Sequence, residues 1–138
     1  MLLMLEDDAE RITRFRAILA EIAPTLPLRI WRDAHVMIAE MDTLLPFTTL
    51  ISLDHDLEPE MSTSTDPGTG WDLAQVLAER PPICPIILHT SNSDRATWMT
   101  GAFDMGGWKV YRVPPLGDDW IEFDWRRLVR RILRRRRP

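Results

Sequence analysis

The sequence is poor in residues that could cross-link the chain or anchor it in a membrane. Cys84 is its only cysteine, which excludes an intrachain disulfide and a cysteine-based zinc site, and we expect this thiol to be buried and inert rather than reactive. No run of eighteen apolar residues occurs, and the apolar residues 1–5 are followed by Glu6, Asp7 and Asp8 rather than by a cleavage site. We therefore expect no membrane span and no signal peptide, and we expect the protein to be cytoplasmic.

Acidic residues are missing from the C-terminal end of the chain, because all 21 of them precede Arg126. Residues 1–125 hold 9 basic residues against those 21, a net charge of −12, whereas residues 126–138 carry +8. The basic residues of this end are the arginines Arg126, Arg127, Arg130, Arg131, Arg134, Arg135, Arg136 and Arg137. Such a tail can contact the phosphates of a nucleic acid, pair with the acidic body of the same protein, or remain a solvated helix end.

Apolar segments of strand length alternate along the chain with segments that have helical spacing of apolar residues. The predicted strands are Leu2–Leu5, Leu28–Trp31, Leu50–Leu53, Ile86–Leu88 and Trp108–Val113. The predicted helices are Ala9–Ala23, a segment between Asp33 and Pro46, Trp71–Glu79, Asp94–Met105 and Trp120–Arg136. Within the fourth helix we expect Trp98, Ala102 and Met105 to face inward.

Strands that alternate with helices at this spacing form βαβ units and a mostly parallel sheet with helices on both faces. Right-handed crossovers place the first, third and fourth strands side by side, in the doubly wound order 2-1-3-4-5. We therefore predict a three-layer α/β fold of the flavodoxin-like type with a five-stranded parallel sheet. Residues 1–138 would form one domain that ends in an arginine-rich helix and tail at 120–138.

Polar residues follow the first, third and fourth predicted strands, whose carboxyl ends meet at one crevice in this strand order. These residues are Glu6, Asp7, Asp8, Asp54, His55, Asp56, His89, Thr90, Ser91 and Asn92. Up to five carboxylates would share the crevice, and so many like charges oppose folding unless a cation neutralises them. Oxygen ligands of this kind suit Mg²⁺ or Mn²⁺, with phosphate oxygens completing the coordination shell.

Several of these residues also have a purely structural interpretation. Asp8 precedes a helix and could be its N-cap instead of a metal ligand. His55 could be a loop histidine that a backbone carbonyl satisfies, and His89 could be a core histidine. Asp7 and Asp54 have no such alternative, so we interpret both as residues of a metal or phosphate site.

The order of these residues resembles the receiver domain of two-component response regulators. The matching residues are the acidic metal-binding pair Asp7 and Asp8, the phosphoacceptor Asp54, the conserved hydroxyl of Thr90, and Pro114. One part of the pattern is missing, because Val113 stands where the receiver pattern has its conserved lysine. Arg112 lies beside that position and Lys109 lies further back.

The departures from the receiver pattern are similar to those of a narrower family, the cyclic-phosphate processing receiver domains. The similarity spans residues 2 to about 113 and rests on Ser-Leu-Asp-His-Asp-Leu at 52–57, Gly-Trp-Asp-Leu at 70–73, and His-Thr-Ser-Asn at 89–92 with Arg95 and Met99. In that family a glycine often follows the first motif. Here Glu58 stands at that position, and a longer loop rich in serine and threonine reaches Gly70.

This resemblance implies that the protein binds Mg²⁺ or Mn²⁺ and processes a cyclic phosphate or another phosphodiester, on an RNA end or a nucleotide. The implied metal ligands are Asp7, Asp8, Asp54 and Asp56, of which Asp56 could instead orient His55. The implied catalytic residues are Asp54, His55 and His89, with the two histidines as base and acid. The implied phosphate-binding residues are Arg11, Thr90, Ser91, Asn92 and Arg95.

Two other functions compete with this metal-dependent phosphodiesterase. A signalling receiver or pseudo-receiver would accept a phosphoryl group at Asp54, or bind a phosphorylated ligand, without catalysis. A binding or scaffold domain would keep the fold without the chemistry. The expected partners are a phosphate-containing small molecule or an RNA end, together with nucleic-acid contact through the arginine-rich C-terminus.

Overall fold

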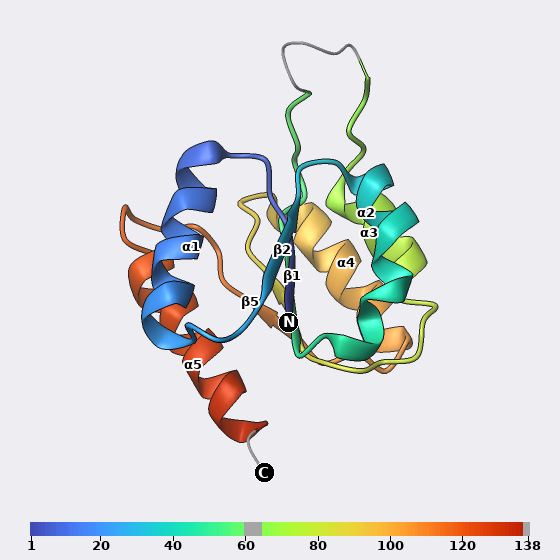
Figure 1. Ribbon diagram of the computed structural model, residues 1–138. Helices are drawn as coiled ribbons and strands as arrows, with labels where there is room; N and C mark the ends of the chain where they lie inside the picture. The colour runs from blue at the N-terminus through green and yellow to red at the C-terminus, as the bar shows by residue number, and fades with distance from the viewer. Residues whose placement is uncertain (60–64, 137–138) are drawn as a thin grey trace.

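The chain folds around one parallel β-sheet, drawn in Figure 1 from a computed structural model that describes residues 1–59 and 65–136. The strands are β1 (Leu2–Leu5), β2 (Leu28–Trp31), β3 (Leu50–Leu53), β4 (Ile86–Leu88) and β5 (Val110–Arg112). They pair in the order β2-β1-β3-β4-β5, and every pairing is parallel. The predicted doubly wound α/β fold is therefore confirmed, with a last strand that is shorter than predicted.

Helices cover both faces of this sheet. They are α1 (Ala9–Ile22), α2 (Ala34–Glu40), α3 (Gly70–Leu77), α4 (Ser93–Met105) and α5 (Arg126–Arg135). In Figure 1, α1 and α5 lie on one face of the sheet, and α2, α3 and α4 lie on the other. Two short 3₁₀ turns, Met41–Thr43 and Leu45–Phe47, follow α2, and a π-helical turn, Ile121–Trp125, precedes α5. No helix in the described ranges has the length and apolar character needed to cross a membrane.

Side-chain caps determine where the first four helices begin. In each of them, an oxygen of the capping side chain accepts a hydrogen bond from the backbone N–H three residues further on. The capping residues are Asp8 for α1, Asp33 for α2, Thr69 for α3 and Asn92 for α4. A cap of this type stabilises a helix by about 1 kcal/mol. Polar residues after the strands thus serve to start the next helix as well as to line the edge of the sheet.

The residues of β1 are fully buried and point alternately into two apolar cores. Leu3 and Leu5 belong to the core beneath α2, α3 and α4, whereas Leu2 and Met4 belong to the core beneath α1 and α5. A strand that is buried on both faces explains why this segment is continuously apolar. Burial of each such side chain contributes about 1.5–3 kcal/mol, so the central strands hold the edge of the sheet in place.

The inward face predicted for α4 is wrong. Trp98 is 49% exposed and Met105 is 93% exposed, whereas Ala96, Met99 and Phe103 are buried. Both sets of residues have helical spacing, so periodicity alone could not choose between them. Trp98 makes two contacts on the surface. The Arg95 guanidinium lies 3.8 Å from its ring centroid, and the Trp71 ring packs against it edge to face.

The single cysteine lies in the interior, as predicted. Cys84 is buried, and burial raises the pKa of its thiol to about 12, which leaves little reactive thiolate at neutral pH. Two predicted segments fall partly outside the described residues. These are the loop between Glu58 and Gly70, of which 60–64 are not described, and the tail at 120–138, of which 137–138 are not described.

Gly70 joins α3 to the loop that follows β3. Its N–H donates a hydrogen bond to the carbonyl oxygen of His55 at 2.9 Å. A Cβ atom at this position would collide with the carbonyl oxygen of Asp54 and would press against the Cα atom of His55. The backbone of α3 can approach the loop this closely only because residue 70 has no side chain.

The substitution Gly70→Ala is expected to lower the free energy of unfolding by about 1–3 kcal/mol, because backbone atoms must move to admit the new methyl group. Gly101→Ala is the matched control, since nothing lies within 4 Å of a Cβ atom built at that position in α4. We expect the control to raise stability by up to about 1 kcal/mol through helix propensity. Urea unfolding of both variants measures the difference, and equal effects would contradict the close approach.

Candidate functional site

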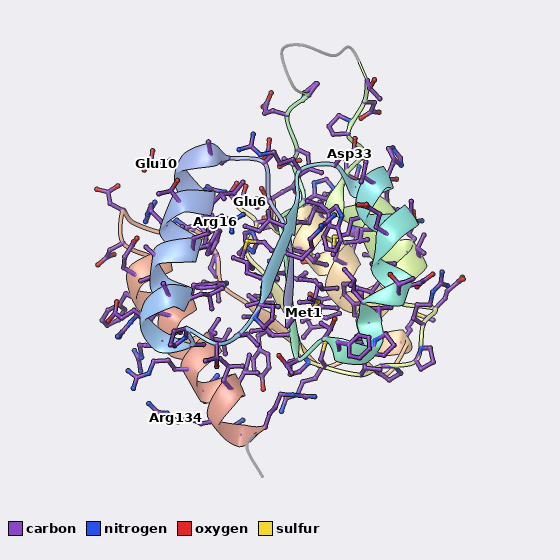
Figure 2. The ribbon with its side chains drawn as sticks, viewed as in Figure 1. Met1, Glu6, Glu10, Arg16, Asp33 and Arg134 are labelled. Carbon is purple, nitrogen blue, oxygen red and sulfur yellow. The ribbon has the colours of Figure 1, made fainter. Side chains whose placement is uncertain are left out.

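The carboxyl ends of β1, β3 and β4 meet at one edge of the sheet, as the predicted topology requires. A cavity of about 400 Å³ opens there, which we call the acidic cavity. Its lining residues are Glu6, Asp7, Asp8, Arg11, Asp54, Asp56, Glu58 and Ser91. Figure 2 shows Glu6 at the end of the sheet away from Met1, beside the first turn of α1. All five acidic residues predicted to share a crevice line this cavity.

Three carboxylates in this cavity are close enough to share one ion. Glu6, Asp7 and Asp54 each offer an oxygen, and these oxygens all lie within 4.8 Å of one another. Among the described residues this is the one group of acidic, histidine or cysteine side chains with that property. Hard carboxylate oxygens fit Mg²⁺ or Mn²⁺, which keep several positions for water or phosphate oxygen. Asp8 lines the cavity but stands outside this group, and its side chain caps α1.

Glu6 is a fully buried carboxylate, with 0% of its surface exposed. Its Oε2 accepts hydrogen bonds from the backbone N–H groups of Asp7 and Asp8, and its Oε1 lies 3.2 Å from Nε2 of His89. Burial alone would raise the pKa of Glu6, but the hydrogen bond and the charge of His89 outweigh it and hold that pKa below its ordinary value. Glu6 is therefore held as a carboxylate.

His89 connects Glu6 to a buried polar chain. Its Nδ1 lies 2.7 Å from the hydroxyl oxygen of Ser52, which accepts a hydrogen bond from Nε1–H of Trp125 at 3.1 Å. Because the indole nitrogen can only donate, the Ser52 hydroxyl can either donate to Nδ1 or accept from it, and in both cases Nε2–H of His89 is available to donate to Glu6. Both ring nitrogens have protein partners and His89 is fully buried. Its link to the cavity is therefore its hydrogen bond to Glu6.

Asp54 shares the cavity with Glu6 but has a different electrostatic environment. It is 5% exposed, and burial raises its pKa to about 7, although the charges of His89 and Arg11 oppose this rise. Burial also raises the pKa of Asp7. Nη1 of Arg11 lies 3.9 Å from Oδ2 of Asp54 and 3.7 Å from Oε1 of Glu6. A guanidinium therefore supplies part of the positive charge that these carboxylates need.

His55 has a carboxylate partner in the next residue. Its Nδ1 lies 2.8 Å from Oδ1 of Asp56, and its backbone N–H donates to Oδ1 of Asp54 at 2.7 Å. The imidazole is buried, whereas Asp56 is exposed and lines the cavity. This pairing fixes the ring through Nδ1 and leaves Nε2 without a hydrogen-bond partner among the described residues.

The predicted phosphate-binding residues are only partly brought together. Arg11 and the exposed Ser91 line the acidic cavity. The hydroxyl of Thr90 accepts a hydrogen bond from the N–H of Asn92, and Asn92 caps α4. Arg95 lies on the surface of α4 with its guanidinium over Trp98, and it is not among the residues that line the cavity.

Sequence reasoning did not single out Glu6 as a metal ligand, nor Glu58, Ser52 or Trp125 as parts of the site. Glu6 directly follows four fully buried strand residues, and a charged side chain that continues a buried strand is a signal that could have marked it. The N–H of Glu58 donates to Oδ2 of Asp7, which ties the loop after β3 to the carboxylate group. The partners of Ser52 lie far along the chain, so no local motif marks it.

Solved structures of similar fold are receiver domains. A response regulator receiver domain from Rhodospirillum rubrum superposes with a TM-score of 0.68 at 17% identity, covering 96% of this chain and 92% of that one. The non-phosphorylated HemR receiver domain from Leptospira biflexa gives 0.65 at 21% identity, covering 99% and 96%. The Mn²⁺-bound form of the response regulator Rcp1 gives 0.56 at 18% identity, covering 95% and 89%. At these identities the similarity establishes the fold.

The sequence places the chain in a narrower group than the fold does. It has no significant match among curated proteins. A family model for the cyclic-phosphate processing receiver domain matches residues 1–105, which include β1, β3, β4 and every residue of the acidic cavity. The chain therefore belongs to the cyclic-phosphate processing receiver domain family.

Proposed function

We propose that this protein is a metal-dependent enzyme that processes a cyclic phosphate or another phosphodiester, on a nucleotide or an RNA end. The observation that carries the proposal is the approach of three carboxylate oxygens, from Glu6, Asp7 and Asp54, to within 4.8 Å of one another beside Arg11. Carboxylates at this density favour a cation, and the phosphate oxygens of a substrate would complete its coordination. The membership of the family supports the same class of substrate.

The bound metal would be Mg²⁺ or Mn²⁺, held by Glu6, Asp7 and Asp54, with Asp8 and Asp56 lining the same cavity. The Mn²⁺-bound Rcp1 structure supports this choice, because it has the same fold. When bound, such an ion neutralises charge that develops on the phosphate oxygens during hydrolysis. The protein contributes the geometry, since the N–H groups of residues 7 and 8 and the side chain of His89 hold Glu6 in place.

The remaining steps require groups that bind phosphate and move a proton. Arg11 is the cation of the cavity and would clamp a non-bridging phosphate oxygen, with the exposed Ser91 hydroxyl beside it. His55 would exchange the proton at Nε2, while Asp56 orients its ring and stabilises the imidazolium. His89 would act through Glu6, since it is buried beneath the cavity with both nitrogens hydrogen-bonded.

The alternative, a signalling receiver phosphorylated at Asp54, is not favoured. Lys109 is the only lysine of the chain, and it precedes β5, at the end of the sheet away from the acidic cavity. Its Nζ lies 5.4 Å from the ring centroid of Tyr111. The position that follows β5 at the cavity end is the buried Val113. No lysine could therefore contact a phosphoryl group on Asp54.

Asp54→Asn is expected to stabilise the metal-free protein at pH 8 and to have little effect at pH 4. The folded-state pKa of about 7 exceeds the ordinary value of 3.8, so the wild type loses stability as pH rises from about 4 to about 7. Asparagine cannot ionise, and the variant should exceed the wild type by about 1–3 kcal/mol at pH 8. Urea unfolding at both pH values measures this difference.

Mn²⁺ should make the wild type more stable than Asp54→Asn at pH 8. It should stabilise the wild type by about 2.7 kcal/mol at one hundred times the dissociation constant and should stabilise Asp54→Asn much less. Asp94→Asn is the control, because Asp94 is exposed on α4 and should leave both responses within about 0.5 kcal/mol of the wild type. A variant at position 54 that is less stable than the wild type at pH 8 without metal would contradict the buried-carboxylate interpretation.

The purified protein should hydrolyse 2′,3′-cyclic nucleotides or RNA with a cyclic-phosphate end when Mg²⁺ or Mn²⁺ is present. His55→Gln should lower kcat by about 10²–10⁴, the range for loss of a general acid or base. His35→Gln is the matched control, because His35 lies exposed on α2. Chromatographic separation of the products measures turnover. If no such substrate is hydrolysed, even with protein near the substrate concentration, the proposed activity is refuted.

A further inference from the structure

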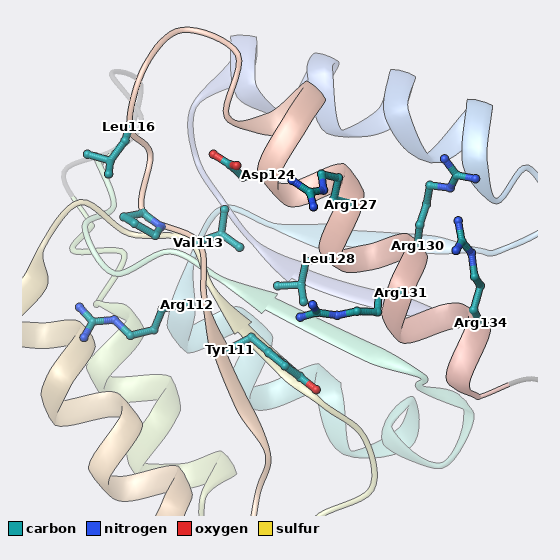
Figure 3. Close-up of a pocket in the computed structure, with 11 residues that line it drawn as sticks. Tyr111, Arg112, Val113, Leu116, Asp124, Arg127, Leu128, Arg130, Arg131 and Arg134 are labelled. Carbon is teal, nitrogen blue, oxygen red and sulfur yellow. The ribbon is translucent and has the colours of Figure 1, made fainter.

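A second cavity, larger than the acidic one, lies between β5 and α5. It has a volume of about 710 Å³ and is drawn in Figure 3; we call it the basic groove. Its charged lining consists of one carboxylate, Asp124, and five guanidinium groups, those of Arg112, Arg127, Arg130, Arg131 and Arg134. All of these arginines are exposed. The groove therefore has a strong excess of positive charge, although residues 1–125 as a whole carry −12.

The arginines of the basic groove have no carboxylate partner among residues 1–59 and 65–136. None of them lies within salt-bridge distance of an acidic side chain in the described ranges. Arginines elsewhere do pair: Arg29 with Glu40, Arg80 with Asp42, and Arg14 with Glu10 and Glu122. Of the arginines in α5, Arg126 alone pairs with a described acidic residue, which is Glu21. The hypothesis that the basic end simply neutralises the body therefore fails for the groove.

The arginines of α5 form a row along one face of the helix. Arg127, Arg131 and Arg134 are spaced by four and three residues, which places them on the same side of the helix, and Figure 3 shows them along the groove. At 1.5 Å per residue the row extends over about 10 Å. The opposite face of α5 is packed into the core through Val129 and Ile132. The row is thus held in place by the fold rather than carried on a loose tail.

The floor of the groove is apolar and includes one aromatic ring. Tyr111 of β5 is half-buried, and the guanidinium of Arg131 lies 5.8 Å from its ring centroid. Leu116, which is 71% exposed, and the largely buried Leu128 extend this surface. Proteins that bind single-stranded nucleic acids combine cations that contact the phosphates with aromatic rings on which bases stack, and this groove offers both.

We propose that the basic groove binds a short segment of single-stranded RNA or DNA, with its phosphates on Arg127, Arg131 and Arg134 and a base against Tyr111. Arginine suits phosphate because its planar fork can donate two parallel hydrogen bonds. An acidic body repels a strand everywhere else, so the contact is confined to a few nucleotides. The family match ends at residue 105 and every lining residue lies beyond it, so this proposal does not rest on the membership of the family.

The test measures the binding of a fluorescein-labelled RNA of about ten uridines with a 3′-hydroxyl. Fluorescence anisotropy reports the binding, and no divalent metal is present. Affinity should fall steeply between about 50 and 200 mM salt. The double variant Arg127→Gln with Arg131→Gln should weaken binding about tenfold and lower the slope of log K against log salt by about 1.4, the value for two lost phosphate contacts. The matched control is Arg16→Gln with Arg32→Gln, which removes the same charge from exposed positions outside the groove and should leave the slope unchanged.

A second pair of measurements separates a nucleic-acid strand from any small polyanion. Tyr111→Leu should weaken binding of the RNA at least about fivefold, because a stacked base is lost, and should leave binding of inorganic tripolyphosphate unchanged. No RNA binding at low salt, or equal losses in the groove and control double variants, would refute the proposal. It would also fail if Tyr111→Leu affected the two ligands equally, since that result would indicate a general anion site. Because neither metal nor a cyclic phosphate is used, these outcomes do not depend on the proposed enzymatic activity.

Discussion

The carboxylate of Glu6, fully buried at the end of β1, is the constraint on which the arrangement of the site depends. A buried charge without partners is strongly destabilising, and removing one partner of such a pair costs about 3–5 kcal/mol. The chain meets this requirement with two local groups, the N–H groups of Asp7 and Asp8, and with one distant group, His89 at the end of β4. His89 in turn is held by Ser52 of β3, and Ser52 by Trp125 before α5. One buried carboxylate is thus linked through hydrogen bonds to β3, to the end of β4 and to the turn that precedes α5.

The burial of Glu6 gives the carboxylates of the acidic cavity different protonation behaviour. With Glu6 kept ionised by its partners, burial makes Asp54 the group that holds a proton near neutral pH. Arg11 supplies a cation to both, at 3.7 and 3.9 Å, but one guanidinium cannot neutralise three carboxylates. The folded protein without metal therefore tolerates an electrostatic cost at Asp54, and that cost is relieved either by a proton or by a bound cation. A site that is destabilised in this way is suited to bind a cation tightly.

The fold could be predicted from the sequence because several local signals agreed. The continuously apolar strands β1, β3 and β4 are buried on both faces, and Asp8 marks a helix start with a side-chain cap. The edge of the sheet that holds the site followed from the strand order. The strand order did not show which carboxylates form the group of three. Glu6 and Asp8 are both acidic residues after β1, and only the direction of each side chain distinguishes Glu6, which faces the other carboxylates, from Asp8, which caps α1. The burial of His89 depends on Ser52 and Trp125, which are 37 and 73 residues apart from their partners in the chain. On α4, two sets of apolar residues have the same helical spacing, so the spacing could not predict which set is buried.

The opposite charges of the two cavities place different demands on an anionic ligand. A phosphate can approach the acidic cavity only after a bound cation has offset part of its negative charge, whereas the basic groove attracts phosphates without any metal. If both sites act on one RNA, the order of events follows from electrostatics: the groove holds the strand at any metal concentration, and the metal then controls whether a phosphodiester can occupy the acidic cavity. Salt would weaken the first step more than the second, because the exposed guanidinium groups are screened more strongly than the buried carboxylates of Glu6 and Asp54. The two steps are therefore separable by ionic strength and by metal.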